Sequence, residues 1–425
     1  MRVPKIFADA ASLAGLLILM LSFPLAAAPA CTDVGSVKGV STAQKGDAID
    51  SAADLAAALK RANGGEVFLL ASGNYGRLAL KKAFSTPVTI RSASAKAPAC
   101  FTELLIKGAE NIVLDGLVFD YTFTEGDRSS ANRFGIVQSR NITISNSVFD
   151  GGYDRGAGHG RGLRFKDSAS IELRNNVFRK WWKALTGGSS TDVTISGNEF
   201  TDIRSDGMAM GAIDGLTIEA NLLHNFRGVE GRKDHRDMLQ IMRASNQRST
   251  NIVIRDNIFD MGAGGYAQTI WMGGDGKDLG DPKLRHQNVL IENNMIYNAH
   301  AHGISVHGID NLSIRKNSVI RVRRAKSGRI TIPQIKVSSD STYVVIEQNV
   351  VGKIAGYKNQ RDWAVLNNAM VQDTSPSGPG FYDRQFTYYA TGQRNGYNEY
   401  GVRPGSIIDR LNAGSTLTKA YPTRR

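Results

Sequence analysis

One short pattern of apolar and polar positions recurs along much of the chain. Its clearest copy spans residues 140–149, where alternating apolar residues lead to an Asn and then to a second short apolar stretch. Alternation with a period of two predicts a β-strand that turns one row of side chains inward and the other outward. Further copies follow at residues 170–178, 192–200, 215–223, 251–259, 288–296, 311–319 and 343–351.

The spacing of the copies predicts a solenoid. The Asn of each copy lies at position 146, 176, 198, 221, 257, 294, 317 or 349, so successive copies are 30, 22, 23, 36, 37, 23 and 32 residues apart. A base period near 22 residues with occasional insertions is typical of stacked coils, because one coil cannot bury its own apolar face. We expect the Asn to suit a tight bend, since Asn tolerates the left-handed region, and to stack into a ladder of amides. The predicted fold is all-β, a single-stranded right-handed parallel β-helix.

This repeat resembles the pectate-lyase-like superfamily of right-handed parallel β-helices, over residues 88–353. That superfamily includes polysaccharide lyases, polygalacturonases and C5-epimerases, so the resemblance implies a carbohydrate-active protein. It selects no single reaction, because one solenoid hosts many chemistries.

The segments outside the repeat are expected to be a signal peptide and two caps. Residues 1–30 combine early basic residues, an apolar run and an Ala-rich cleavage site, which is typical of a secretory signal peptide. Residues 31–86 are expected to hold an amphipathic helix at 54–63 that ends at two glycines and caps the solenoid. The β-helix is expected at 87–356, and an irregular C-terminal cap and tail at 357–425. The order of helix, GGEVFLLASGNYG and coils is similar to the N-terminus of the alginate lyase and chondroitinase B family.

The chain has two cysteines, Cys31 and Cys100. In an exported chain they most simply form one disulfide, which would tie the mature N-terminus to the first coils. Two alternatives stay open. Both thiols could be free and buried, or Cys31 could carry a lipid, although the residues before it lack the Leu of a lipobox.

The formal net charge of +13 indicates a polyanionic partner. For an exported protein, periplasmic or secreted, an acidic polysaccharide is the expected polyanion, whereas nucleic acid would be expected in the cytoplasm. Attraction to the cell surface or plain solubility would explain the same charge. No stretch of the sequence is apolar for long enough to predict a transmembrane helix, and we expect a monomer.

A second short strand precedes each repeated copy, and the residues at the entrance of these strands are polar. Adjacent strands lie about 4.8 Å apart, so equivalent positions on successive coils become neighbours in space. The predicted entrance column consists of Arg161, Lys183, Asp206, Asp237, Gln268 and His302.

Part of this column is similar to the ordered motifs of the polygalacturonases. The resemblance implies that Asp206 and Asp237 are acid/base carboxylates, that His302 supports them, and that Lys336 binds a substrate carboxylate. The chain departs from that family at Arg236, which replaces the first Asp of a pair, and an extra coil separates Asp237 from His302.

The densest charged cluster spans residues 230–237, in a long loop of the kind that carries binding and catalysis on regular scaffolds. A uronate lyase needs a base for the C5 proton and a cation that neutralises the adjacent carboxylate. His235 or Lys233 is the candidate base, and Arg232, Arg236 and Arg243 are candidate neutralisers. The side chains expected to bind substrate around them are Gln240, Gln268, Trp271, His302, His307 and Lys336. The same residues also fit an ordinary charged loop with turn-favouring Asp.

Calcium is the metal that the cluster would suit. Glu230, Asp234 and Asp237 are candidate ligands, because calcium prefers several carboxylate oxygens. The sequence has no HExxH motif or cysteine set for zinc, no EF-hand loop, and no Gly-rich phosphate loop. No other cofactor is expected.

The sequence therefore favours an exported protein that acts on an acidic polysaccharide, with a uronate lyase working by β-elimination as the leading hypothesis. The enzyme alternatives are an inverting glycoside hydrolase using Asp206 and Asp237, and an enzyme like the mannuronan C5-epimerases. The alternative from another class is a non-catalytic glycan-binding or surface-assembly β-helix protein.

Overall fold

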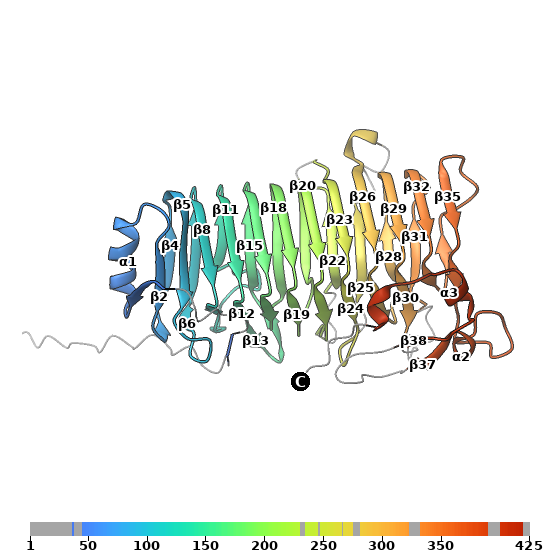
Figure 1. The fold of residues 1–425 in the computed structure, drawn as a ribbon, viewed down its shortest axis with the longest axis horizontal. Coiled ribbons are helices and arrows are strands. Elements are labelled where there is room, and N and C mark those ends of the chain that lie inside the picture. Colours follow the sequence, from blue (N-terminus) through green and yellow to red (C-terminus); the bar gives the residue numbers. More distant parts are fainter. Residues whose placement is uncertain are drawn as a thin grey trace, which may run out of the picture.

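The computed structural model describes residues 36–37, 45–229, 234–244, 247–265, 267–274, 281–322, 332–389 and 400–419. In these residues, short parallel strands stack coil upon coil into one long solenoid (Figure 1). The predicted all-β parallel β-helix is therefore confirmed. Candidate active residues lie on one of its three faces.

Each complete coil contributes one strand to each of three faces, and strands of one face pair in parallel with the next coil. Face 1 consists of β4 (Arg77–Leu80), β7 (Glu103–Lys107), β10 (Phe134–Val137), β15 (Arg161–Lys166), the first halves of β18 (Lys183–Ser196) and β20 (Met208–Glu219), β22 (Asp237–Met242), β25 (Gln268–Gly273), β28 (His302–Val306), β31 (Gln334–Val337) and β34 (Ile354–Ala355).

Face 2 follows face 1 along the chain and includes the second halves of β18 and β20. Its other strands are β1 (Asp47–Ile49), β2 (Val67–Leu70), β5 (Ala83–Ser92), β8 (Glu110–Asp115), β11 (Arg140–Ser145), β16 (Ala169–Arg174), β23 (Thr250–Arg255), β26 (His286–Glu292), β29 (Ile309–Arg315), β32 (Thr342–Glu347) and β35 (Trp363–Leu366).

Face 3 holds the second apolar stretch of each repeated copy. It consists of β3 (Gly73–Asn74), β6 (Ala99–Phe101), β9 (Val118–Asp120), β12 (Val148–Asp150), β17 (Val177–Arg179), β19 (Glu199–Thr201), β21 (Leu222–His224), β24 (Ile258–Asp260), β27 (Met295–Asn298), β30 (Ser318–Arg321), β33 (Val350–Val351) and β36 (Ala369–Met370).

The core fills the space between the three faces. Inward positions of successive strands form apolar columns, as alternation requires. The final Phe of the repeated copies forms one such column on face 3, in which Phe149, Phe178 and Phe200 stack with ring centroids 4.6 and 4.9 Å apart. The inward positions predicted for face 1 are fully buried: Leu163, Leu185, Met208, Leu239, Ile270 and Ile304.

An amide ladder runs through the bend between faces 2 and 3, as predicted. Asn257, for example, donates from Nδ2 to Oδ1 of Asn294 at 3.0 Å and accepts from Nδ2 of Asn221 at 3.0 Å. One detail of the prediction is wrong: the left-handed residue is the one before the ladder Asn, such as Asn175 with a φ of 56°. Asn146 (φ 52°) occupies that left-handed position, and Ser147 takes its place at the start of the ladder.

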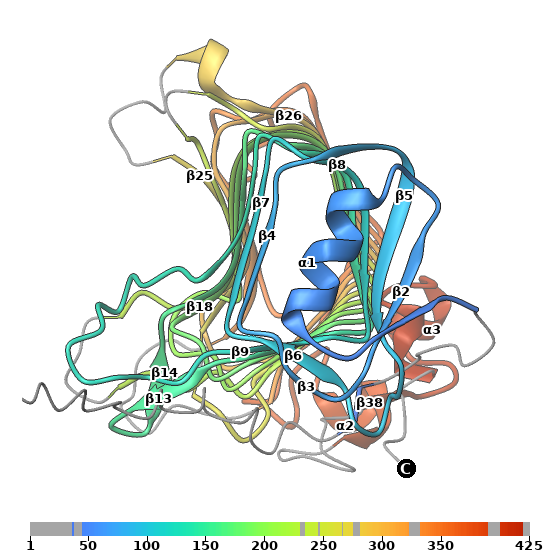
Figure 2. The same ribbon diagram turned by 90° about the vertical axis from the view of Figure 1, so that its left-hand side faces the viewer.

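Helix α1 (Ala52–Arg61) closes the N-terminal end of the solenoid (Figure 2). The side chain of Ser51 accepts a hydrogen bond from the backbone N–H of Asp54, which caps the first turn. Leu55 and Ala58 are the buried face of the helix. Parallel pairing extends from β1 to β36, beyond the range of 87–356 expected from the sequence.

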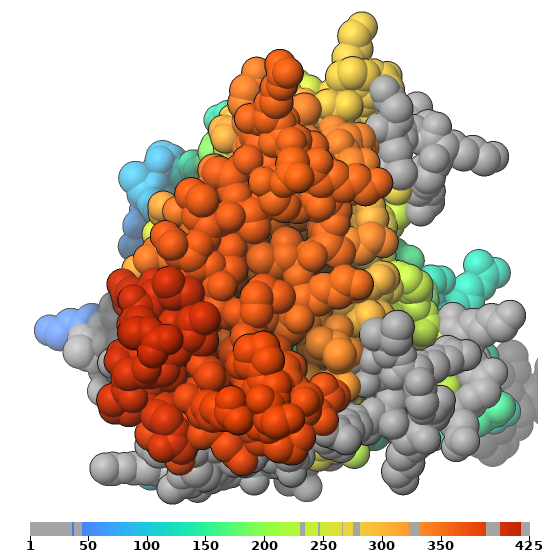
Figure 3. Space-filling model, turned by 90° about the vertical axis from the view of Figure 1, so that its right-hand side faces the viewer, coloured from blue at the N-terminus to red at the C-terminus, as the bar shows by residue number. Residues whose placement is uncertain are grey.

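The C-terminal segment folds back over face 3 of the last coils (Figure 3). It contains α2 (Tyr382–Gln385), β37 (Phe386–Tyr389), β38 (Tyr400–Val402), α3 (Ile407–Arg410) and η2 (Thr416–Lys419). Tyr382, Phe386 and Tyr400 pack with outward apolar residues of face 3 such as Met295. The C-terminal segment thus covers face 3 at this end. The apolar cluster that it forms contains no residue of the face 1 strands. Among the described residues, no helix is long and apolar enough to cross a membrane.

Candidate active site

Loops project beyond both edges of face 1 (Figure 2). The hairpin of β13 (Gly152–Asp154) and β14 (Ala157–His159) lies at the edge where the chain arrives from face 3. The 3-10 helix η1 (Pro282–Leu284) lies in the connection that leaves β25 for face 2. Face 1 therefore forms the floor of a surface bounded by loops.

The predicted entrance column exists. Arg161 pairs in register with Lys183, and Asp237 pairs with Gln268. Between them, Nζ of Lys183 lies 2.5 Å from Oδ2 of Asp206. Asp206 and Asp237 are both buried, with 1% and 0% of their surface exposed. The predicted role of these two residues as acid/base carboxylates would place them against the sugar, and neither is exposed here.

Asp237 instead holds the imidazole of His235. Oδ2 of Asp237 lies 2.6 Å from Nδ1 of His235 and also accepts a hydrogen bond from Nε2 of Gln240 at 3.1 Å. The side chain of His235 is 64% exposed, so its ring projects from the buried carboxylate toward solvent. A buried acid that orients an accessible imidazole is the arrangement of a histidine base.

Gln268 connects this pair to His302. Its Oε1 lies 2.5 Å from Nδ1 of His302, and its Nε2 lies 2.8 Å from Nε2 of His235. Since an amide oxygen only accepts and an amide nitrogen only donates, His302 donates to Gln268 and Gln268 donates to His235. His235 must then donate from Nδ1 to Asp237, which leaves Nε2 as its basic atom. The extra coil that separates Asp237 from His302 is thus the coil that links them.

Burial sets the protonation of this network. It raises the pKa of Asp237 to about 7, with a further rise from the charge of Asp206, while His235 opposes it. Burial lowers the pKa of His302, and the positive charge of Lys336 lowers it further. The pKa of the neighbouring His300 falls to about 4 for the same reason, burial first and His302 second. Burial therefore favours the neutral form of His300 and His302 beside this carboxyl group.

The outward column of face 1 beside this network contains three of the predicted substrate-binding residues. Gln240 pairs with Trp271, Trp271 with Ser305, and Ser305 with Lys336. Trp271 turns outward between the buried Ile270 and Met272, and its ring centroid lies 5.9 Å from that of His307.

Arg243 follows β22 at the opposite edge of the face from His235. Its three guanidinium nitrogens are buried and form no hydrogen bond with any part of the chain that the structure describes. A Cβ on Gly274 would lie 2.8 Å from its Nη1, so a glycine there leaves room for the guanidinium. Arg243 is therefore separated from His235 by the length of one strand.

Arg236 and Asp234 are placed differently from the expectation. The guanidinium of Arg236 packs over two glycines, since a Cβ on Gly228 or Gly265 would come within 2.9 or 3.0 Å of it. Asp234 binds Arg204, with its oxygens 2.8 and 3.2 Å from Nε and Nη2. Asp234, one of the three expected calcium ligands, is therefore already bound to an arginine. The described residues contain no group of three or more acidic, His or Cys side chains that could hold a metal ion.

Four residues of the expected site lie outside the described residues: Glu230, Arg232, Lys233 and Cys31. Cys100, the predicted partner of Cys31, is buried and disulfide-bonded.

The loop before β22 is held by Arg204 and Ser205, to which the sequence assigned no role. Oγ of Ser205 donates to the backbone oxygen of His235 at 2.5 Å, and the Arg204–Asp234 ion pair lies beside it. Arg204 and Ser205 directly precede Asp206, just as the charged loop directly precedes Asp237 on the next coil. Their position one coil before a charged loop was the signal that could have identified them.

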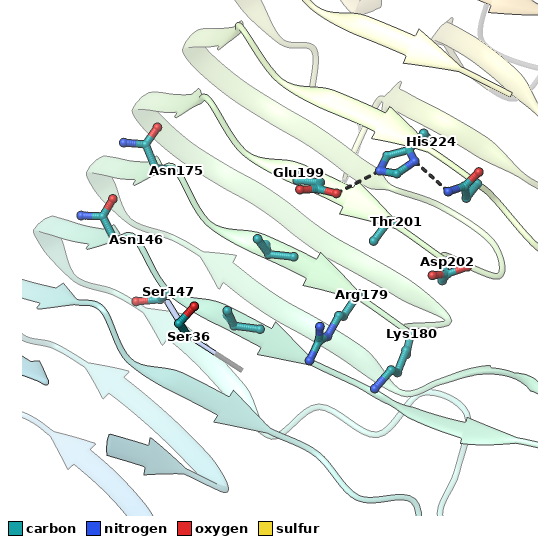
Figure 4. Close-up of a pocket in the computed structure, with 13 residues that line it drawn as sticks. Ser36, Asn146, Ser147, Asn175, Arg179, Lys180, Glu199, Thr201, Asp202 and His224 are labelled. Atoms are coloured by element: carbon teal, nitrogen blue, oxygen red, sulfur yellow. Dashed lines mark hydrogen bonds and ion pairs between the residues drawn. The ribbon is translucent and has the colours of Figure 1, made fainter. Parts of the chain in front are cut away.

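A separate pocket of about 550 Å³ lies on face 3 (Figure 4). Its ionic groups are paired with each other or with neighbours. Nε2 of His224 lies 3.1 Å from Glu199, and Arg179 and Lys180 both bind Asp150. The structure places none of the predicted site residues in it.

Comparison with known proteins shows what the chain is similar to. A protein family described as "Right handed beta helix region" matches residues 134–351. No curated protein sequence matches the chain.

Three solved structures resemble the fold at low identity. An alginate lyase from Paenibacillus sp. str. FPU-7 has 15% identity and a TM-score of 0.44, over 75% of this chain and 96% of that one. PfbA, a surface adhesin of Streptococcus pneumoniae, has 12% identity and a TM-score of 0.45, over 83% and 95%. The A-module of the Azotobacter vinelandii mannuronan C-5 epimerase AlgE6 has 15% identity and a TM-score of 0.42, over 76% and 96%.

Proposed function

Because this chain belongs to the right-handed β-helix family, whose scaffold leaves the chemistry to the site, we propose a function from the geometry of face 1. The protein is a polysaccharide lyase that cleaves an acidic polysaccharide of uronic acid units by β-elimination. His235 is the base that removes the C5 proton.

The observation that carries this proposal is the direction of the hydrogen bonds around His235. Nδ1–H is held by Asp237 at 2.6 Å, so Nε2 carries the lone pair. The ring is 64% exposed and can meet a substrate, while the buried carboxylate stabilises the imidazolium formed when the proton arrives. Gln268 now donates to Nε2 and must give up this contact when the substrate binds.

The electrostatics of face 1 support a polyanionic substrate. On face 2, outward cations are paired with acids, such as Arg255 with Glu219 at 2.7 Å and Arg315 with Glu292 at 2.9 Å. On face 1, Arg164 and Lys336 have no ion pair with any residue that the structure describes. Cations without an acidic partner attract a polyanion.

Lys336 is the candidate binder of a substrate carboxylate near His302. It lies in the outward column and is close enough to lower the pKa of His302, which belongs to the His235 network. In the proposed reaction the C5–H bond breaks, the C4=C5 double bond forms and the C4–O4 bond breaks. The proton that His235 removed ends on O4.

The burial of Asp206 and Asp237 favours this reaction over hydrolysis. An inverting hydrolase needs two carboxyl groups that face the sugar from opposite sides, with room for a water molecule. Here one carboxylate is held by Lys183 and the other by His235 and Gln240, and neither is exposed. C5-epimerisation begins with the same proton abstraction. Analysis of the products distinguishes it from elimination.

The test is a product analysis on alginate, polygalacturonate and hyaluronan. We expect products with the ultraviolet absorbance of a C4=C5 double bond. New reducing ends without that absorbance would indicate a hydrolase, and deuterium uptake at C5 without cleavage would indicate an epimerase. If wild-type protein yields none of the three signals, the enzyme proposal is wrong and a binding or assembly role replaces it.

We also propose that the chain is exported, because residues 1–30 have the pattern of a signal peptide. Sequencing the N-terminus of protein recovered from the periplasm or medium tests this. An intact Met1 would contradict it.

A further inference from the structure

Two arginines of face 1 lie together on β15, three coils before the strand that follows His235. Arg161 begins the strand in the entrance column, and Arg164 lies in the outward column. The two are close enough that the charge of Arg164 adds to the effect of burial in lowering the pKa of Arg161. Placing two guanidinium groups together without a counterion is unfavourable, so the arrangement favours a bound anion.

Neither arginine takes part in an ion pair with the described residues. Arg164 is exposed and takes part in no ion pair among them. Arg161 has a buried Nε atom without a hydrogen-bond partner. The acidic residue that acts on Arg161 is Asp206, whose carboxylate is bound by Lys183 at 2.5 Å.

Trp182 restrains Arg161 and the neighbouring Lys183. It lies in the short connection before β18, and its ring contacts a cation from each of two adjacent coils. Cζ of Arg161 lies 5.6 Å and Nζ of Lys183 lies 5.1 Å from the ring centroid. Cation–π contacts of this length restrain the two long side chains and keep both charges on face 1.

The positive surface continues away from His235. A cavity of about 230 Å³ lies on the preceding coils and is lined by Arg164, Arg133 and Arg77 around a single acid, Glu103. Glu103 lies 3.5 Å from Arg77 and 3.6 Å from Arg133, so its charge is already shared. Arg164 thus stands between this cavity and the His235 network.

We propose that Arg161, positioned by Trp182, and the exposed Arg164 form a second anion-binding subsite that holds a carboxylate of another unit of the same polysaccharide. Three spacings of about 4.8 Å place it on the order of 14 Å from the strand that follows His235. The subsite therefore binds a sugar unit that lies several units along the polysaccharide from the bond that is cleaved. This inference rests on the proposed function for the identity of its ligand.

The experiment measures binding apart from turnover. Affinity electrophoresis of the His235→Ala variant is run in gels that contain alginate, polygalacturonate, hyaluronan or dextran sulfate. The same background then receives Arg161→Ala with Arg164→Ala, or the exposed Arg164→Glu alone. The matched control removes two cations from face 2, Arg174→Ala with Arg255→Ala.

We expect the face 1 double variant to weaken binding of the retained polyuronate at least tenfold, and the face 2 control to leave it within twofold. Arg164→Glu should weaken it as well, which guards against a folding defect at Arg161. A disaccharide cut from the same polymer should bind all variants equally, because it cannot reach both sites.

Three results would overturn the subsite: equal binding by the double variant, equal weakening by the face 2 control, or no retention of the His235→Ala protein by any of the four polymers. The outcome is independent of the reaction. If Arg161 and Arg164 control binding but wild-type protein gives no product, the subsite stands and the lyase proposal fails. Product formation by wild-type protein, together with unchanged binding in the double variant, would support the lyase proposal and refute the subsite.

Discussion

Nδ1 of His235 lies 2.6 Å from Oδ2 of Asp237, and the two side chains differ widely in solvent exposure. The imidazole is 64% exposed, whereas the carboxylate is fully buried. The accessible group can exchange a proton with a substrate, and the buried group keeps it in one tautomer. This relationship gives rise to the predictions for His235 and Asp237.

Replacing His235 should remove activity without affecting folding. His235→Ala is expected to lower kcat about 10³-fold, within the range for loss of a general base. Its melting temperature should stay close to wild type, because most of the side chain is in water. Product absorbance and thermal unfolding check the two parts. Tyr343→Ala, at a 71% exposed position on face 2, is the control for a harmless surface change.

Arg236→Ala separates two roles for the neighbouring residue. Since its guanidinium packs over Gly228 and Gly265, we expect a lower melting temperature together with reduced kcat. A loss of kcat alone, with unchanged stability, would instead identify Arg236 as the group that neutralises the substrate carboxylate.

The pH dependence should report the buried carboxyl group. Burial raises the pKa of Asp237 to about 7, so the folded protein binds its proton more tightly than the unfolded chain does. Its contribution to stability is therefore fully present below the unfolded pKa near 4 and is lost as pH rises to about 7. We expect kcat/KM to rise over the upper part of this interval, because the ionised form stabilises the imidazolium.

Asp237→Asn should uncouple these two effects. It removes a buried charge, so the melting temperature at pH 8 is expected to rise while kcat falls. A variant that is both less stable at pH 8 and fully active would contradict the assignment of Asp237.

Gln268 should act through His235 as a positioning residue. Gln268→Leu leaves Nδ1 of His302 and Nε2 of His235 without their present partner and is expected to lower kcat roughly tenfold to a hundredfold. Gln268→Glu adds a negative charge beside both rings and should shift the pH profile upward. A purely structural role would change stability but leave the pH profile in place.

Trp271 should contribute to substrate binding alone. Its ring is the aromatic surface in the outward column next to Gln240, and stacking is worth about 0.5–1.5 kcal/mol. Trp271→Ala is therefore expected to raise KM roughly threefold to tenfold with little change in kcat. Trp271→Phe should recover most of the loss, and initial-rate kinetics on one polymer measure both.

The amide ladder should dominate stability. Asn257 is fully buried, and the two hydrogens of its Nδ2 are shared among the backbone oxygens of Ile218 and Arg255 and Oδ1 of Asn294. Asn257→Ala leaves several of these groups unpaired, and we expect it to lower the free energy of unfolding by about 3 kcal/mol. Asn146→Gly is the matched control, because Asn146 precedes the ladder in a left-handed conformation that glycine accepts. Denaturant unfolding compares the two variants.

Periodic positions were the most predictable from the sequence. Alternation placed Leu163 and its equivalents inward, and the register of Arg161 with Lys183 and of Asp237 with Gln268 followed from it. Non-periodic positions were harder. Asn146 was assigned to the ladder because it looks like Asn176, yet the bend is one residue out of step there and Ser147 takes the place.

The sequence by itself determined the parallel β-helix and the residues that share the entrance column, because short period-two strands repeated about every 22 residues must stack coil upon coil to bury their apolar face. Only the tertiary structure decided what each member of that column does. Asp206, Asp237 and His302 are all polar residues at equivalent positions. The sequence pattern alone does not predict which of their side chains are buried. Stacking the coils buries both carboxylates, gives one to Lys183 and the other to His235, and leaves the imidazole exposed.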